Sequence, residues 1–112
     1  MITLANITFD CADSATLAAF WSQALQRPVD DGANEHFATI GADEPGPTLM
    51  FLKVPEAKAA KNRCHVDLSA DDRDAEVKRL LGLGAAYLAE HDEYGHQWVV
   101  LQDPSGNEFC VA

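Results

Sequence analysis

The feature that most constrains the fold is a repeated pattern, a strand followed by a helix, which occurs near the N-terminus and again in mid-chain. Segments 6–13 and 65–72 both alternate polar and apolar residues and then run into acidic residues. Alternation with a period of two is typical of a half-buried strand. An acidic residue just after such a strand is well suited to cap a helix. The repeat therefore predicts two similar halves, each opening with a strand and a helix.

The helix in each half is predicted by apolar spacing. After Asp13, which we expect to be the N-cap, apolar residues stand at positions 17, 20, 21, 24 and 25, and this spacing places them on one helical face. Pro28 favours an end to that helix. In the second half we expect Asp71 or Asp72 to be the N-cap of the helix, and apolar residues follow at positions 77, 80 and 81. Gly84 suits the left-handed position just beyond the end of that helix.

Three short strands follow each predicted helix, separated by segments rich in Gly, Pro and Asp. We expect them at 28–30, 36–40, 48–54, 86–90, 97–102 and 108–111. The order is βαβββ twice, so the fold class is α+β. A half of about 50 residues buries too little surface to fold alone. We therefore expect one domain over residues 1–112, with halves 1–55 and 62–112 joined by a linker at 56–61, forming an open eight-stranded cup with a helix outside each half.

Composition narrows the function classes. The formal net charge is −10, which disfavours binding to nucleic acid or to anionic membrane surfaces. No apolar run approaches the roughly 20 residues of a membrane span, and segment 1–6 lacks the pattern of a secretory signal. The three cysteines show no C-x-x-C spacing, which argues against a disulfide framework or a structural zinc site. We expect a cytoplasmic protein.

Several segments resemble glyoxalase-like domains of the vicinal oxygen chelate superfamily, the glyoxalase, bleomycin resistance and dioxygenase type. The resemblance covers nearly the whole chain, and its most specific part is the final hairpin at 98–110. The segments that carry it are Asp10-Cys11-Ala12-Asp13, Phe20-Trp21, Lys61-Asn62-Arg63-Cys64-His65-Val66-Asp67-Leu68, Leu83-Gly84-Ala85 and Trp98-Val99-Val100-Leu101-Gln102-Asp103-Pro104-Ser105-Gly106-Asn107-Glu108-Phe109-Cys110. The resemblance implies paired βαβββ modules wrapped into a cup.

The resemblance also implies where a metal would bind. Metal enzymes of this superfamily hold a divalent ion with four ligands from the first and fourth strands of each half, typically His, Gln or Glu. Those positions fall here on Asn6, Phe51 (Met50 if the register shifts by one), His65 and Cys110. Only His65 is a ligand of the usual kind. We therefore expect no metal cofactor, with a divalent ion held by His65, Cys110 and Glu108 as the less favoured alternative.

Alternation along the strands predicts which side chains line the cup. The predicted ligand pocket combines apolar surface with a few polar groups, as small-molecule sites do. It consists of Asn6, Thr8, Asp10, Phe51, Lys53, Arg63, His65, Asp67, Trp98, Glu108 and Cys110. The acidic members could receive a cation or could pair with Lys53 and Arg63. We interpret His36, His91 and His96 as surface residues.

His65 is the candidate catalytic residue, because an imidazole titrates near neutrality and Asp67 shares its strand face. We favour the other interpretation, a hydrogen-bonded histidine without chemistry, because no nucleophile or metal is paired with it. Cys110 could act as a nucleophile beside it, although a cysteine in a C-terminal strand more often serves packing.

Three functions follow. The favoured one is a metal-independent module, not an enzyme, that binds a cationic or aromatic small molecule, as bleomycin-resistance relatives do. The others are a metal-dependent lyase, isomerase or dioxygenase, and a metal-free enzyme using His65 as acid or base. Analogy with relatives predicts a homodimer.

Overall fold

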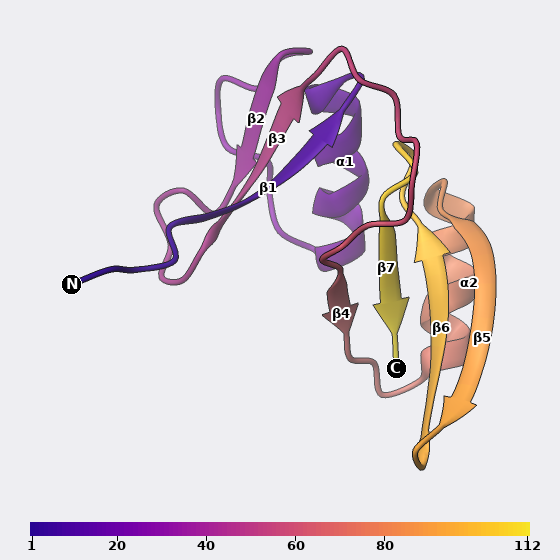
Figure 1. Cartoon of the computed structure of the whole chain (residues 1–112). Coiled ribbons are helices and arrows are strands. Elements are labelled where there is room, and N and C mark those ends of the chain that lie inside the picture. Colours follow the sequence, from indigo (N-terminus) through magenta and orange to yellow (C-terminus); the bar gives the residue numbers. More distant parts are fainter. The chain divides into compact units, whose positions relative to one another are not determined.

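The computed structural model describes all residues, 1–112, and divides into two compact units, Met1–Ala57 and Lys58–Ala112. The first unit contains β1 (Asn6–Cys11), α1 (Ser14–Leu25), β2 (Phe37–Ile40) and β3 (Thr48–Lys53). The second contains β4 (Val66–Leu68), α2 (Arg73–Leu83), β5 (Ala86–Glu93), β6 (His96–Gln102) and β7 (Glu108–Val111). Figure 1 shows each helix beside the strands of its own unit. The predicted α+β class is confirmed, as seven strands in two open mixed sheets.

Both helices begin where their capping residues predict. The Asp13 carboxylate accepts a hydrogen bond from the Thr16 N–H at 3.0 Å, and that of Asp72 accepts from the Ala75 N–H at 3.1 Å. Each bond satisfies a donor that the first helical turn would otherwise leave unpaired. No helix of the chain is both long enough and apolar enough to cross a bilayer.

One predicted strand of the first unit is absent. Segment 28–30 makes a single backbone bond toward β2, in which the Asp30 N–H donates to the Thr39 carbonyl at 2.9 Å. Pro28 has no N–H to continue a ladder. The Asp30 carboxylate instead accepts from the Thr39 hydroxyl at 2.7 Å and the Ala42 N–H at 2.9 Å. These bonds, that from Thr39 above all, lower the pKa of Asp30. Segment 28–30 is thus a loop, which the hydrogen bonds of the Asp30 side chain hold against β2 and the residues after it.

The faces of β1 and β3 correct the predicted position of Phe51. The sheet order is β1-β3-β2, and the parallel register places Phe9 beside Phe51 and Thr8 beside Met50. Phe9 lies 5.4 Å, between ring centroids, from both Phe51 and the α1 residue Trp21. Phe51 is fully buried, so it lies on the face that packs against α1. The prediction that it shares a face with Thr8 was wrong by one residue.

The second unit has the sheet order β4-β7-β6-β5, with β4 parallel to β7 and the other pairs antiparallel. One face carries the buried side chains of Leu101 and Phe109, which are register partners. The opposite face carries Asp67 and Val100, both of which are register partners of Cys110. Because side chains alternate between the faces of a sheet, the polar residues of β4 and β7 are gathered on that second face.

Candidate functional site

A cavity of about 490 Å³ lies on this polar face of the second unit, and all of its lining residues belong to that unit. Five of them were predicted from the sequence as pocket residues: His65, Asp67, Trp98, Glu108 and Cys110. Six were not: Lys61, His91, His96, Gln97, Val100 and Ala112. The volume is in the range of small-molecule sites, about 300–1,000 Å³.

Three side chains in the cavity wall form a close cluster. The parallel pairing of β4 with β7 places Asp67 beside Cys110, and His65 precedes β4. Nδ1 of His65 lies 2.8 Å from Oδ1 of Asp67 and 3.9 Å from Sγ of Cys110. One potential ligand atom from each residue falls within 4.8 Å of the others. An imidazole, a carboxylate and a thiol are therefore assembled on two neighbouring strands.

The environment of Cys110 keeps it protonated. Partial burial raises the pKa of the thiol, and the charge of Asp67 and a hydrogen bond to it raise the pKa further, against an opposing effect of Lys61. A nucleophilic cysteine needs a lowered pKa or a base positioned to take its proton. Here Asp67 and Cys110 both face the same nitrogen of His65, so a relay through the two ring nitrogens is not formed.

Glu108 has a structural role instead of the ligand role considered for it. Its side chain is 7% exposed. One carboxylate oxygen accepts from Lys58 Nζ at 3.0 Å and the other from the Asn62 N–H at 3.1 Å. Burial by itself raises the pKa of Glu108, but these bonds outweigh it and lower the pKa. Asp67, and not Glu108, is the residue whose ligand atom lies within 4.8 Å of those of His65 and Cys110.

An aromatic wall faces the cavity from β5 and β6. The rings of His91 and Trp98 are stacked, with centroids 5.1 Å apart and planes 23° from parallel. Tyr94 and Gly95 form the two-residue turn, both with positive φ, and pairing outward from it brings His91 opposite Trp98. His96 is exposed and His91 is half-buried, in line with their interpretation as surface residues, but both also line the cavity, where the predicted pocket did not include them. The sequence did contain a signal for the pairing of His91 with Trp98, because the length of a hairpin turn fixes which residues of its two strands lie opposite each other.

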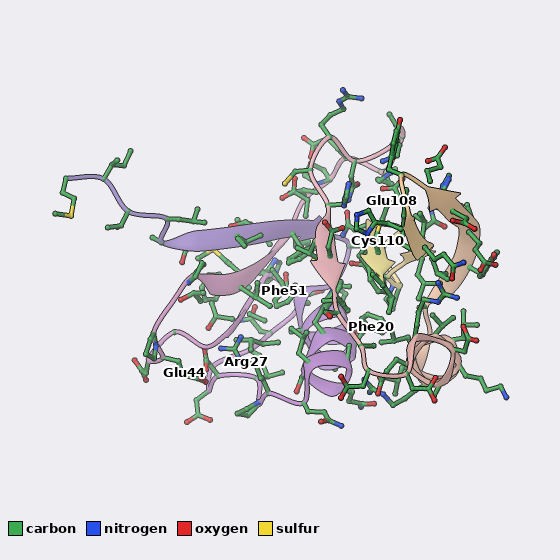
Figure 2. The ribbon with its side chains drawn as sticks, turned by 90° about the horizontal axis from the view of Figure 1, so that it is seen from below. Phe20, Arg27, Glu44, Phe51, Glu108 and Cys110 are labelled. Carbon is green, nitrogen blue, oxygen red and sulfur yellow. The ribbon has the colours of Figure 1, made fainter.

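The remaining predicted pocket residues do not line this cavity. Asn6, Thr8, Asp10 and Lys53 belong to the first unit, where Lys53 pairs with Glu35 at 3.3 Å. Arg63 is exposed in the second unit, just before β4. Figure 2 shows Glu108 and Cys110 together at β7 of the second unit, while Phe51 belongs to the first.

A family model described as the glyoxalase-like domain matches residues 6–112. The chain belongs to this family. The predicted resemblance to glyoxalase-like domains is thereby confirmed. Among curated proteins, the search found no match.

Solved structures with the same fold span the full glyoxalase-like domain. A glyoxalase/bleomycin resistance protein/dioxygenase family enzyme from Burkholderia phytofirmans PsJN is 17% identical, with a TM-score of 0.78 over 98% of this chain and 97% of the other. A mutant of the fosfomycin resistance protein FosX from Listeria monocytogenes, complexed with Mn(II) and a dihydroxypropylphosphonic acid, is 15% identical, with a TM-score of 0.77 over 99% and 90%. The bleomycin-binding protein of Streptomyces verticillus, complexed with copper(II)-bleomycin, is 18% identical, with a TM-score of 0.64 over 100% and 98%. At these identities the likeness shows the fold.

The donor set that the glyoxalase-like family implies for a divalent metal does not fit this chain. Its four positions hold the amide of Asn6, the thioether of Met50, the imidazole of His65 and the thiol of Cys110. Met50 takes the second position instead of Phe51, because Met50 is the residue of β3 that pairs with Thr8. Oxygen-preferring ions such as Mg²⁺ and Mn²⁺ need carboxylate or carbonyl ligands, and none of these four positions offers a carboxylate. We therefore derive no chemistry through such an ion.

Proposed function

We propose that this glyoxalase-like domain binds a small aromatic molecule, neutral or cationic, in the cavity of its second unit, without a resident metal ion as part of the binding site. The observation that carries the proposal is the stacked pair of His91 and Trp98 beside a polar wall in a cavity of about 490 Å³. An indole face attracts both flat aromatic groups and cations. The polar wall would fix the orientation of the ligand.

Charge supports a neutral or cationic ligand over an anionic one. Glu108 is neutralised by Lys58, so Asp67 is the cavity carboxylate without a lysine or arginine partner, and it is exposed. The whole chain adds a net charge of −10, which attracts cations over distance. Two of the solved structures with this fold are named as complexes with small molecules, copper(II)-bleomycin and a phosphonic acid, which is consistent with a binding role.

The test is a ligand screen in the presence of EDTA, with aromatic amines, cationic antibiotics and aromatic metabolites as probes. We expect at least one class to raise the melting temperature and to quench the fluorescence of Trp98. Trp98→Leu should weaken that binding about tenfold or more, since stacking on an aromatic side chain contributes about 1–3 kcal/mol. Tyr87→Leu is the matched control, because Tyr87 is an exposed aromatic residue of β5 that does not line the cavity. No binder in the screen, or equal loss in both variants, contradicts the proposal.

A second candidate function is acid–base catalysis by His65. It is favoured by one observation: Asp67 contacts Nδ1, which leaves Nε2 as the ring atom available to a substrate. Every binder from the screen should be incubated with the protein and analysed for products. Turnover that survives in His65→Gln would remove this candidate.

The homodimer also stays a prediction. Met1, Ile2 and Leu4 expose apolar side chains, which a second copy of the chain would cover. Size-exclusion chromatography with light scattering measures the mass directly, and a monomer at micromolar concentration would contradict it. The cytoplasmic location likewise stays a prediction.

A further inference from the structure

Two opposite charges in the cavity lack an oppositely charged partner. Asp67 and Lys61 both line the cavity. Asp67 contacts the imidazole of His65 but pairs with no lysine or arginine, and 68% of its side chain is exposed. Lys61 is exposed and takes part in no ion pair of the chain. Because Lys58 already neutralises Glu108, one carboxylate and one ammonium group are left to meet a ligand.

Asp67 and Lys61 lie around the same atom, the sulfur of Cys110. The parallel register places Asp67 beside Cys110. Burial is the main cause that raises the pKa of the Cys110 thiol, the charge of Asp67 raises that pKa further, and the charge of Lys61 lowers it. Both charges thus act on one thiol, although no ion pair joins them. A ligand that carries an ammonium and a carboxylate group on one carbon atom can meet both of them at once.

The stacked rings of His91 and Trp98 lie farther along the same face of the sheet. Trp98 stands two residues before Val100 on β6, and Val100 is the register partner of Cys110. From Asp67 to Trp98 the backbone therefore spans two strand spacings across the sheet and two residues along a strand, roughly 12 Å. The side chains between them, those of Val100 and Cys110, are small. The sheet therefore offers a charged end and an aromatic end above a low floor.

We propose that this cavity binds an aromatic α-amino acid or a close zwitterionic analogue, whose ammonium group contacts Asp67, whose carboxylate contacts Lys61 and whose ring stacks on Trp98. The inference rests on the proposed binding of an aromatic molecule and names its chemical class. A zwitterion carries no net charge, which matches a cavity whose two available charges cancel. An aromatic amine would satisfy only the carboxylate, and an aromatic acid only the ammonium group, so each should bind more weakly.

The experiment measures dissociation constants by isothermal titration calorimetry, in EDTA at about pH 7, where amines and carboxylates are both charged. The phenyl probes are L-phenylalanine, phenethylamine, which lacks the carboxylate, and 3-phenylpropanoate, which lacks the ammonium group. L-tryptophan, tryptamine and indole-3-propionate form the matching indole set. We expect the amino acid of at least one set to bind about tenfold or more tightly than its two analogues, since hydrogen bonds between charged groups are the stronger ones.

Two variants assign the charged groups of the ligand to their partners. Asp67→Asn should weaken binding of the amino acid and of the amine about tenfold, without weakening that of the acid. Lys61→Gln should weaken binding of the amino acid and of the acid, without weakening that of the amine. Asp31→Asn and Lys78→Gln are the matched controls, because both residues are exposed and outside the cavity, and they should change none of the constants. Circular dichroism shows whether each variant folds.

The outcomes separate this inference from the proposed function. If the amine binds at least as tightly as the amino acid in both sets, or if Lys61→Gln leaves binding of the amino acid unchanged, the zwitterion assignment is overturned and the aromatic site at Trp98 stands. If no probe of either set binds while the ligand screen yields another aromatic molecule, the zwitterion assignment alone fails. If the screen yields no aromatic ligand either, both proposals fail.

Discussion

The ammonium group of Lys58 lies 3.0 Å from a carboxylate oxygen of Glu108, and joins the first residue of the second unit to the first residue of β7. Glu108 also accepts the Asn62 N–H. Segment 58–62 is thus held against β7, and Lys61 from this segment lines the cavity. The buried ion pair supports the position of one cavity wall.

Stability should fall in acid because of Glu108. Its pKa is lowered in the folded protein, against a usual value of 4.5. A carboxyl group with a lowered folded-state pKa contributes stability above its unfolded pKa, and the contribution is lost as the pH falls through the folded value. The free energy of unfolding, measured by urea titration, should therefore decrease below about pH 4.5. Asp30 acts with the same sign, so Glu108→Gln should flatten this dependence without abolishing it.

Removing the Glu108 carboxylate altogether should be costly. Glu108→Ala leaves the Asn62 N–H without its acceptor and Lys58, 26% exposed, without its carboxylate partner, although Lys58 also donates to the Ala60 carbonyl. The expected loss is about 1–3 kcal/mol. Glu44→Ala is the matched control, because its pairing with Arg27 at 3.3 Å is on the surface and is worth about 0–1 kcal/mol. Equal losses of unfolding free energy in the two variants would contradict the buried-pair assignment.

The assignment of Phe51 and Met50 to opposite faces of β3 can be tested by comparing their alanine variants. Phe51 is fully buried between Phe9 and β2 residues on the α1 side, whereas Met50 is half-buried on the other face. Phe51→Ala should cost about 3–5 kcal/mol of unfolding free energy through the cavity it creates. Met50→Ala should cost clearly less, because much of its side chain already contacts water. If urea titrations showed a larger loss of unfolding free energy for Met50→Ala than for Phe51→Ala, Phe51 would lie on the same face as Thr8, as the sequence predicted.

Phe51 also shows where the sequence stops being informative. Thr48–Lys53 is apolar at four successive positions, Leu49 to Leu52, so its alternation does not tell one face from the other. In β4 the alternation is clear, and Asp67 lines the cavity together with His65, which precedes the strand. That Cys110 lies beside Asp67 was not predictable from spacing alone, because it depends on the long-range parallel pairing of β4 with β7.

Glu108 and His91 show two other limits of prediction from the sequence. The ion pair with Lys58 joins residues 50 positions apart, and no local pattern indicates it. His91 was missed although the Tyr94-Gly95 turn indicates its partner. The α+β class and the helix caps depend on local patterns, and these were predicted from the sequence.

Two glycines at the end of α2 should respond in opposite ways to alanine. Gly82 lies within the helix, and an added Cβ would meet nothing within 4 Å. Gly82→Ala should therefore stabilise by up to about 1 kcal/mol, since alanine favours a helix. Gly84 has a φ of 120°, a region that residues with a Cβ avoid, so Gly84→Ala should destabilise by about 1 kcal/mol or more. Thermal unfolding of both variants measures the contrast.

The three cysteines should react with iodoacetamide at different rates. Cys64 is exposed, Cys110 is half-buried with a raised pKa, and Cys11 is buried. Only the thiolate reacts, so Cys64 should be labelled first, Cys110 more slowly and Cys11 last, as measured by mass spectrometry of peptides. The Asp67 charge contributes to the raised pKa, so Asp67→Asn should lower that pKa and speed labelling of Cys110 at neutral pH. Cys64 is the internal reference in the same sample. A Cys110 rate that does not change relative to Cys64 would mean that Asp67 does not act on the thiol in solution.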